Sequence, residues 1–364
     1  METIFVSVAS YRDDECPTTL EYIFNNADNP QNVFVGICQQ NDMSKGSPDI
    51  ECTLPDPRYV NNIRLMRLQH YEAKGPTWAR YLCSTLYNNE TYFFQIDSHT
   101  KLVPGWDTKC INMMKYIKTT GMSQKPVLSH YPAAWESYPG NNSNVGGGGV
   151  TRICKSFFNE QGMISFEGAE SIDTNEVFPS PYIAGGFLFC DGSLLRDVPF
   201  DPSLDYLFVG EEILHSIRIW TSGYDIFTPN ENIAYHEYTR TEKPKIWTDK
   251  VYTDDEAFEK VKQLIGLSKM PNSLKSYHYG LGTVRSLNDY YNFAGINMKN
   301  KTVNKNFCRK DFKVDPPPPK GNNIMEHFGN SPDDYDDSTS TGLLTCLFYI
   351  VLVVVICYLY FTVK

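Results

Sequence analysis

An acid and a histidine stand two residues apart at the end of an apolar, aromatic segment. Tyr92–Ile96 predicts a buried strand, and Asp97 and His99 follow it directly. Side chains alternate along an extended chain, so these two face the same side. A carboxylate and an imidazole so placed can grip one divalent ion, and open α/β sheets bind ligands at such strand ends. The tripeptide alone also fits a surface turn in which the acid caps the next segment.

A second histidine late in the chain could complete a set of three ligands. His236 follows the short apolar pair Ala234-Tyr235. Together with Asp97 and His99 it would hold an ion and leave positions open for water and a diphosphate. Imidazoles suit manganese or zinc, whereas the carboxylate and phosphate oxygens favour Mn²⁺ or Mg²⁺. Taken alone, His236 also fits a structural histidine.

Two further patterns point to a cleft. Glu211 and Glu212 follow Gly210 and open a predicted helix, where acids oppose the helix dipole or supply a catalytic carboxylate that orients the acceptor. Gly185 and Gly186 lie in the predicted strand Ile183–Cys190. Paired glycines there allow close approach of a sugar or of another backbone, and a bulge would explain them equally.

Three arginines are candidates for phosphate binding. Arg12 follows the first predicted strand, Arg80 lies in a segment beginning with Gly75-Pro76, and Arg240 comes four residues after His236. Guanidinium pairs with phosphate in a bidentate manner, although each arginine could equally form a salt bridge. His130 is expected to line the same cleft.

Composition excludes one class and gives an expectation for the cysteines. The formal net charge is -10 and no long basic run is present, so we expect no nucleic acid as a partner. The N-terminus lacks the pattern of a secretory signal. The ten cysteines form no CxxC pair, and we therefore expect reduced core thiols rather than disulfides or a zinc site.

The chain is expected to contain one folded domain and a membrane anchor. Residues 1–300 predict the domain, and 301–342 a linker rich in Pro and Asp. Residues 343–363 form an apolar run of bilayer-spanning length, which predicts a tail anchor with the domain facing the cytosol. Asn141–Gly149 predicts a flexible loop.

The first hundred residues alternate between strand and helix patterns. This alternation predicts βαβ units and an α/β domain with a mainly parallel, twisted sheet flanked by helices. The predicted helices are Thr18–Asn26 and Trp78–Tyr87. The predicted strands, besides those named above, are Ile4–Ala9, Val33–Cys38, Ile63–Leu68 and Ile226–Phe227.

Over roughly residues 3–298 the sequence resembles a known family of glycosyltransferases. These enzymes attach N-acetylglucosamine to hydroxyproline on a cytoplasmic ubiquitin-ligase subunit, and they have bacterial and viral relatives. The resemblance rests on an ordered series of motifs: Ser7–Arg12, Val33–Cys38, Gly75–Arg80, Gln95–His99, Val103–Asp107, His130–Pro132, Ala184–Phe187, Gly210–Glu212, Trp220–Asp225, His236–Arg240 and Tyr279–Ser286.

The resemblance implies a GT-A fold and a retaining transfer that uses a UDP-sugar and a divalent metal. Similarity to mucin-type polypeptide transferases implies Asp97, His99 and His236 as the metal ligands. It places Ser10 and Asp13, within Ser7–Asp13, near the uridine. It also implies a sugar-binding region that includes His130, Gly185, Gly186 and Trp220. The acceptor would be a hydroxyl of a protein or a glycan.

Two other classes of function are compatible with the same residues. A metal-dependent hydrolase would use the Asp and His residues to activate water, and would need neither acceptor nor UDP. A non-catalytic, membrane-anchored protein that binds carbohydrate or plays a structural part would keep the fold alone. The complete set of Asp97, His99 and His236 favours the transferase.

Overall fold

The computed structural model describes residues 2–54, 56–139, 149–166, 170–172, 176–305 and 307–308. The chain divides into a unit of residues 1–317 and a second unit of residues 318–364, and all described residues belong to the first. The apolar run at 343–363, most of the expected linker and almost all of the loop expected at 141–149 lie outside the described residues. Among the helices that are described, none is long and apolar enough to cross a membrane.

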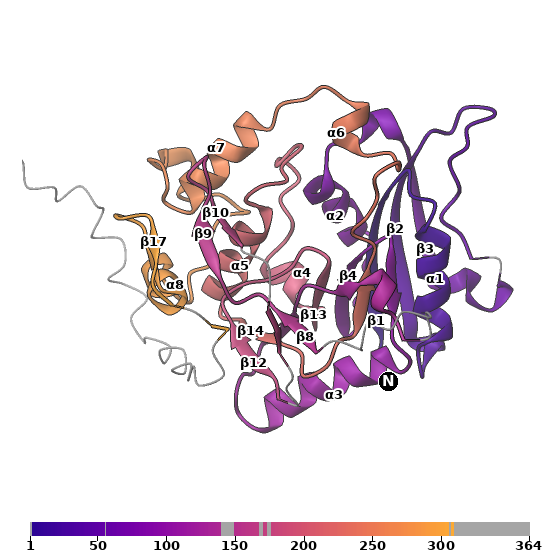
Figure 1. The fold of residues 1–364 in the computed structure, drawn as a ribbon, viewed down its shortest axis with the longest axis horizontal. Coiled ribbons are helices and arrows are strands. Elements are labelled where there is room, and N and C mark those ends of the chain that lie inside the picture. The colour runs from indigo at the N-terminus through magenta and orange to yellow at the C-terminus, as the bar shows by residue number, and fades with distance from the viewer. Residues whose placement is uncertain are drawn as a thin grey trace, which may run out of the picture. The chain divides into compact units, whose positions relative to one another are not determined.

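A large twisted sheet is the centre of the described unit (Figure 1). Eight of the described strands form it in the order β12-β14-β6-β13-β4-β1-β2-β3. Their bounds, in that order, are Phe178–Ser180, Asp225–Thr228, Pro126–Ser129, Phe187–Asp191, Tyr92–Asp97, Ile4–Tyr11, Val33–Asn41 and Ile63–Gln69. The expected parallel half is present, since β3, β2, β1 and β4 run in one direction. β13 is antiparallel to β4 and β6, so the sheet is mixed.

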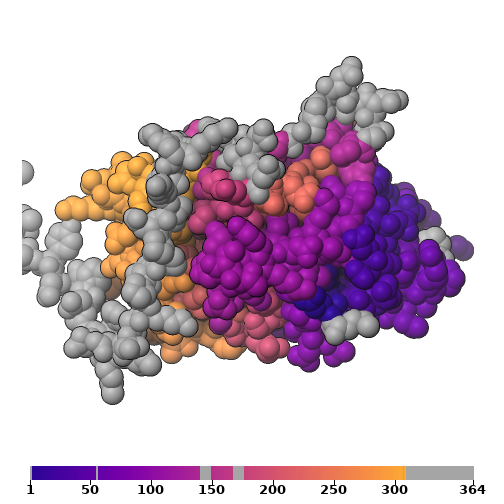
Figure 2. Space-filling model, turned by 90° about the horizontal axis from the view of Figure 1, so that it is seen from below, coloured from indigo at the N-terminus to yellow at the C-terminus, as the bar shows by residue number. Residues whose placement is uncertain are grey.

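Helices cover both faces of this sheet, so its strands are buried on both sides. Along β1, Ile4, Val6 and Val8 join the core beneath α1 (Cys16–Asn25) and α3 (Trp106–Thr119). Phe5 points the other way, into the core that receives Leu194 and Ile219. Three helices lie on this second face: α2 (Pro76–Ser84), the short α4 (Leu194–Asp197) and α5 (Glu211–Thr221). α2 and α5 carry residues of the site described below, and α4 contributes to the core. Figure 2 shows α3 across the middle of the face seen from below.

Smaller elements complete the described unit. A three-stranded sheet has the order β5-β15-β7 and consists of Thr100–Leu102, Ala234–His236 and Ala133–Ala134. Three two-stranded sheets pair β8 with β11, β9 with β10, and β16 with β17. These six strands are Val150–Arg152, Glu170–Ile172, Ser156–Phe158, Ile164–Phe166, Ile296–Asn297 and Thr302–Val303. The remaining α-helices are α6 (Ile246–Asp249), α7 (Asp255–Leu264) and α8 (Leu287–Ala294).

The predicted strand Ile183–Cys190 begins four residues too early. β13 starts at Phe187, and Gly185 and Gly186 lie in the turn before it. The apolar stretch extends further than the strand because Tyr182, Ile183 and Ala184 are buried in a loop. The paired glycines are therefore features of a turn, and the prediction that placed them within a strand is wrong.

The expectation of reduced cysteines is wrong for two pairs. Cys16 is bonded to Cys52, and Cys154 to Cys308. Each bond joins segments that are far apart in sequence, so spacing gave no sign of it. The other cysteines of the described part, Cys38, Cys83, Cys110 and Cys190, are free and buried as expected.

The Cys154–Cys308 disulfide is predicted to stabilise the folded unit. It closes a loop with a sequence separation of 154 residues. Cys308→Ala should lower the free energy of unfolding by about 2–5 kcal/mol, because the open chain has more unfolded conformations. Urea unfolding of both proteins, with and without reductant, measures the difference. Equal stabilities in the absence of reductant would contradict the prediction.

Candidate active site

A cavity of about 630 Å³ opens beside the carboxyl ends of β1, β2 and β4. The first two strands contribute Ala9, Tyr11 and Gln40 to its wall, and β4 contributes Asp97. The rest of the wall comes from the segment that leads into α5 and from the segment that follows β15. The cavity therefore lies where an α/β sheet is expected to bind its ligand.

Strand pairing brings the three predicted metal ligands together. Asp97 ends β4, His99 lies in the turn between β4 and β5, and His236 ends β15. β15 is antiparallel to β5 with His236 opposite Thr100, and the Glu237 N–H donates to the carbonyl of His99 at 3.1 Å. One potential ligand atom from each side chain lies within 4.8 Å of the other two.

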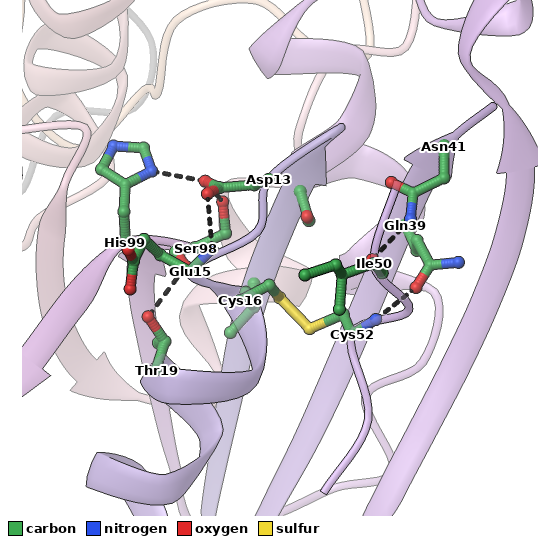
Figure 3. Close-up of a disulfide and its surroundings, with 12 residues drawn as sticks. Asp13, Glu15, Cys16, Thr19, Gln39, Asn41, Ile50, Cys52, Ser98 and His99 are labelled. Carbon is green, nitrogen blue, oxygen red and sulfur yellow. Dashed lines mark hydrogen bonds and ion pairs between the residues drawn. A yellow bond between two sulfur atoms is a disulfide. The ribbon is translucent and has the colours of Figure 1, made fainter. Parts of the chain in front are cut away.

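Asp13 fixes the ring of His99 from behind (Figure 3). His99 Nδ1 lies 2.7 Å from Asp13 Oδ2, and Arg240 Nη2 lies 3.2 Å from the same oxygen. Burial alone would raise the pKa of Asp13, but the hydrogen bond and charge of His99 and the charge of Arg240 lower it to about 2. An ionised Asp13 holds the proton on Nδ1 and leaves Nε2 as the available ligand atom.

Asp97 is held as a carboxylate between a histidine and an arginine. Its Oδ2 lies 3.2 Å from His236 Nε2, and its Oδ1 lies 3.3 Å from Arg80 Nη2. Burial would raise the pKa of Asp97, but the hydrogen bond from His236 and the charges of Arg80 and the two histidines bring it well below its usual range. One carboxylate and two imidazoles are a donor set that fits a divalent transition metal.

The paired glycines leave room for this cluster. A Cβ on Gly186 would lie 2.9 Å from Asp97 Oδ2, and one on Gly185 would lie 3.0 Å from Arg80 Nη2. The carbonyl of Gly185 also accepts a hydrogen bond from Arg80 Nη2 at 3.1 Å. The turn thus packs directly on the ligand cluster, and a larger residue at 186 would displace Asp97.

Glu211 and Glu212 both line the cavity and have different partners. Glu211 forms an ion pair with Arg80 Nη1. Glu212 Oε1 accepts from the Gly185 N–H at 2.7 Å, and its Oε2 accepts from the Tyr131 hydroxyl at 2.7 Å. Burial is the main cause that raises the pKa of Glu212 to about 7. Both oxygens of Glu212 are therefore fixed, and its charge changes near neutral pH.

The residues predicted to bind phosphate and nucleotide differ in their placement. Arg80 and Arg240 line the cavity, as does Asp13, which lies behind His99. Arg12 does not line it, because its guanidinium is held by Asp49 at 2.8 Å and by Asp249 at 2.9 Å.

Three of the residues expected at the nucleotide or the sugar do not line the cavity. Ser10 is buried within β1. Trp220 is buried on α5 against Tyr290 and Phe293, so the expected sugar contact of Trp220 is wrong. His130 is also fully buried, with its ring 4.4 Å from that of Phe187, and burial lowers its pKa to about 3.

Sequence reasoning missed two kinds of residue in the wall. Tyr131 follows β6 next to His130. Its position just past a buried strand could have identified it as a residue of the cavity wall. Phe208 and Trp247 also line the cavity, but they lie in segments without a regular pattern. No signal in the sequence distinguished these aromatic side chains from core residues.

The profile of one protein family matches most of the chain. This family is described as Glycosyltransferase (GlcNAc), and the match covers residues 3–59 and 51–300. No curated protein matches the chain.

Solved structures of low sequence identity are similar in fold. A crystal structure of GalNAc-T7 with UDP, GalNAc and Mn²⁺ has a TM-score of 0.50 at 11% identity. The likeness covers 72% of this chain and 48% of that one, so this chain spans about half the length of GalNAc-T7. A crystal structure of S. aureus TarS 1–349 with UDP-GlcNAc has a TM-score of 0.44 at 12% identity, covering 74% of this chain and 68% of that one.

The cluster is predicted to bind Mn²⁺. Asp97→Asn and His236→Ala should each abolish Mn²⁺ binding measured by calorimetry, because each removes a ligand. Asp13→Asn should weaken binding by about 10–100-fold, since residues that orient a ligand typically contribute that much. His278→Ala, an exposed histidine outside the cluster, is the control and should bind as the original chain does. Unchanged binding in Asp97→Asn would exclude the cluster as the site.

Proposed function

Because the chain belongs to the Glycosyltransferase (GlcNAc) family, we propose that this glycosyltransferase moves N-acetylglucosamine from a UDP-sugar to a hydroxyl of a protein or glycan. In this proposal the fold is of the GT-A type and the reaction retains the anomeric configuration. The observation that carries the proposal is the meeting of Asp97, His99 and His236 at the wall of a cavity that Arg80 and Arg240 also line.

The metal cluster and the arginines would receive the diphosphate. A divalent ion, Mn²⁺ or Mg²⁺, held by Asp97, His99 and His236 would supply charge neutralisation for the leaving UDP. Arg240 supports the same role. Its buried Nη2 lies 3.2 Å from Asp13 Oδ2 and its Nε lies 4.0 Å from Glu237 Oε2, and neither ion pair is an aligned hydrogen bond. A phosphate oxygen in the cavity would offer these N–H groups an aligned, charged partner.

The carboxylates at the start of α5 would orient the acceptor. The acceptor oxygen bonds to the anomeric carbon while the bond from that carbon to the phosphate oxygen breaks. Attack from the face that UDP leaves gives retention, and the departing phosphate oxygen takes the acceptor proton. Glu212, held by Tyr131 and Gly185, is placed to accept a hydrogen bond from the acceptor or to stabilise positive charge on the sugar.

We also propose the membrane anchor at 343–363, on the sequence pattern alone. The linker expected at 301–342 would begin after Cys308, because β17 and the disulfide-bonded Cys308 belong to the folded unit. The compartment of the domain stays a prediction. The Cys16–Cys52 and Cys154–Cys308 disulfides weigh against the cytosol, because disulfides persist mainly in oxidising compartments.

Transfer activity is predicted to depend on Asp97. With Mn²⁺, UDP-N-acetylglucosamine and a panel of acceptors, the original chain should release UDP, and Asp97→Ala should lose at least about 100-fold of that rate through lost leaving-group stabilisation. His278→Ala is the control. Release of product without UDP-sugar would instead favour the metal-dependent hydrolase. No release with any UDP-sugar, together with no thermal shift on adding UDP and Mn²⁺, would favour the non-catalytic alternative.

Glu212 is predicted to make stability depend on pH. Its folded pKa of about 7 is above the ordinary value of 4.5, so the folded chain binds the extra proton between these values. The original chain should therefore lose stability as pH rises from 4.5 to 7, relative to Glu212→Gln, which keeps the shape without the charge. Melting temperatures of both proteins at pH 5 and pH 8 test this. A constant difference between them would contradict the raised pKa.

A further inference from the structure

Two large aromatic side chains are exposed at the mouth of the cavity. Phe208 is 60% exposed and Trp247 is 51% exposed, and both line the cavity. Their ring centroids are 5.4 Å apart, with the rings tilted by 59°. The two rings thus form an open corner whose apolar surfaces remain in contact with water.

The two rings are carried by segments that the fold holds in place. The Tyr206 N–H donates to the carbonyl of Lys74 at 2.6 Å, which fixes the segment bearing Phe208 just before α5. Trp247 lies on α6, and Asp249 at the end of that helix accepts from the Tyr11 hydroxyl at 3.0 Å. Asp249 also pairs with Arg12 at 2.9 Å. Contacts within the protein therefore position the two segments that carry these rings without a ligand.

The corner spans the mouth of the cavity. Phe208 precedes Glu211 by three residues, whereas Trp247 lies on α6, which contacts Tyr11 and Arg12 at the end of β1. In the proposed reaction, an acceptor whose hydroxyl reaches Glu212 enters past these two rings. Apolar side chains that are exposed together mark ligand-binding sites, whereas singly scattered ones need no explanation.

We propose that Phe208 and Trp247 bind a neutral pyranose ring of a glycan acceptor. This inference rests on the proposed transferase function and narrows its acceptor to carbohydrate. A pyranose presents an apolar face of C–H groups and an edge of hydroxyls, so it can stack on an aromatic ring and hydrogen-bond at its rim. Lys245 lines the cavity two residues before Trp247 and supplies a donor for such a hydroxyl.

The charges near the corner favour a neutral ligand. Asp249 is paired with Arg12 at 2.9 Å, and Lys250 donates to the carbonyl of Ala73 at 2.8 Å. On the other side Asp205 is paired with Lys74 at 3.0 Å. These three ion pairs and hydrogen bonds are made within the protein, so the two rings and the Lys245 side chain are the groups offered to a ligand. The uracil ring of the donor is the competing ligand for these two side chains, and the UDP measurement described below distinguishes it from a sugar.

Binding of neutral oligosaccharides to an array tests the proposal on the full chain with UDP and Mn²⁺ present. Phe208→Ala and Trp247→Ala should each lower the affinity for the bound glycans by about tenfold or more, through loss of aromatic contact. Phe208→Tyr and Trp247→Phe keep a ring and should retain most of the binding. Tyr116→Ala is the matched control, because Tyr116 is 54% exposed and does not line the cavity.

The donor arm of the experiment measures UDP affinity by calorimetry in Mn²⁺. All these variants should bind UDP as the original chain does. The proposal is overturned if the alanine variants lose UDP affinity instead, if they keep full glycan affinity, or if the array binds the chain through hydroxylated peptides alone. If the original chain binds glycans but not UDP, the transferase proposal fails, and only the binding of a neutral glycan by the two rings stands.

Discussion

A buried guanidinium joins the two walls of the cavity, and the arrangement of the site depends on it. Arg80 contacts Asp97 on the sheet, Glu211 on α5, and the carbonyl of Gly185 between them. A buried cation is stable only when its charge and hydrogen bonds are satisfied, so these three partners must lie within reach of one side chain. The acidic residues at 97 and 211 in turn raise the pKa of Arg80 against the opposing effect of burial. The same contacts explain why position 185 is glycine.

The sequence allowed the ligands to be identified but not the way in which they meet. Asp97 and His99 were predictable because a buried strand ends just before them. His236 lies more than a hundred residues later, and its approach depends on β15 pairing with β5, strands of three residues each. Such short strands carry too little periodicity to predict their partners. The local pattern made His236 a candidate that equally fitted a structural histidine, and the resemblance to a family favoured it as a ligand.

Contacts between distant segments account for the errors as well. The Cys16–Cys52 bond ties α1 to the segment before β3, and Cys16 lies three residues from Asp13 (Figure 3). A disulfide thus supports the helix end from which Asp13 orients His99, although the spacing of the cysteines suggested free thiols. The predicted sugar contact of Trp220 was wrong for a related reason. A tryptophan on an amphipathic helix packs inward when another helix, here α8, covers it. Neither the bond nor the packing is a property of one segment.

The two halves of the cavity differ in how firmly the fold determines them. The half proposed to hold the donor is built from the ends of β1, β2 and β4, where residues of a buried sheet leave little freedom. The half proposed to hold the acceptor is built from the turn before β13 and the segment leading into α5, and α6 lies at the mouth beside the end of β1. Loops of this kind can change without disturbing the sheet, and binding residues are often found on them. Similarity across the whole domain therefore constrains the metal and the leaving group more than the acceptor, and the side chains around Phe208 and Trp247 are where this chain would set its own specificity.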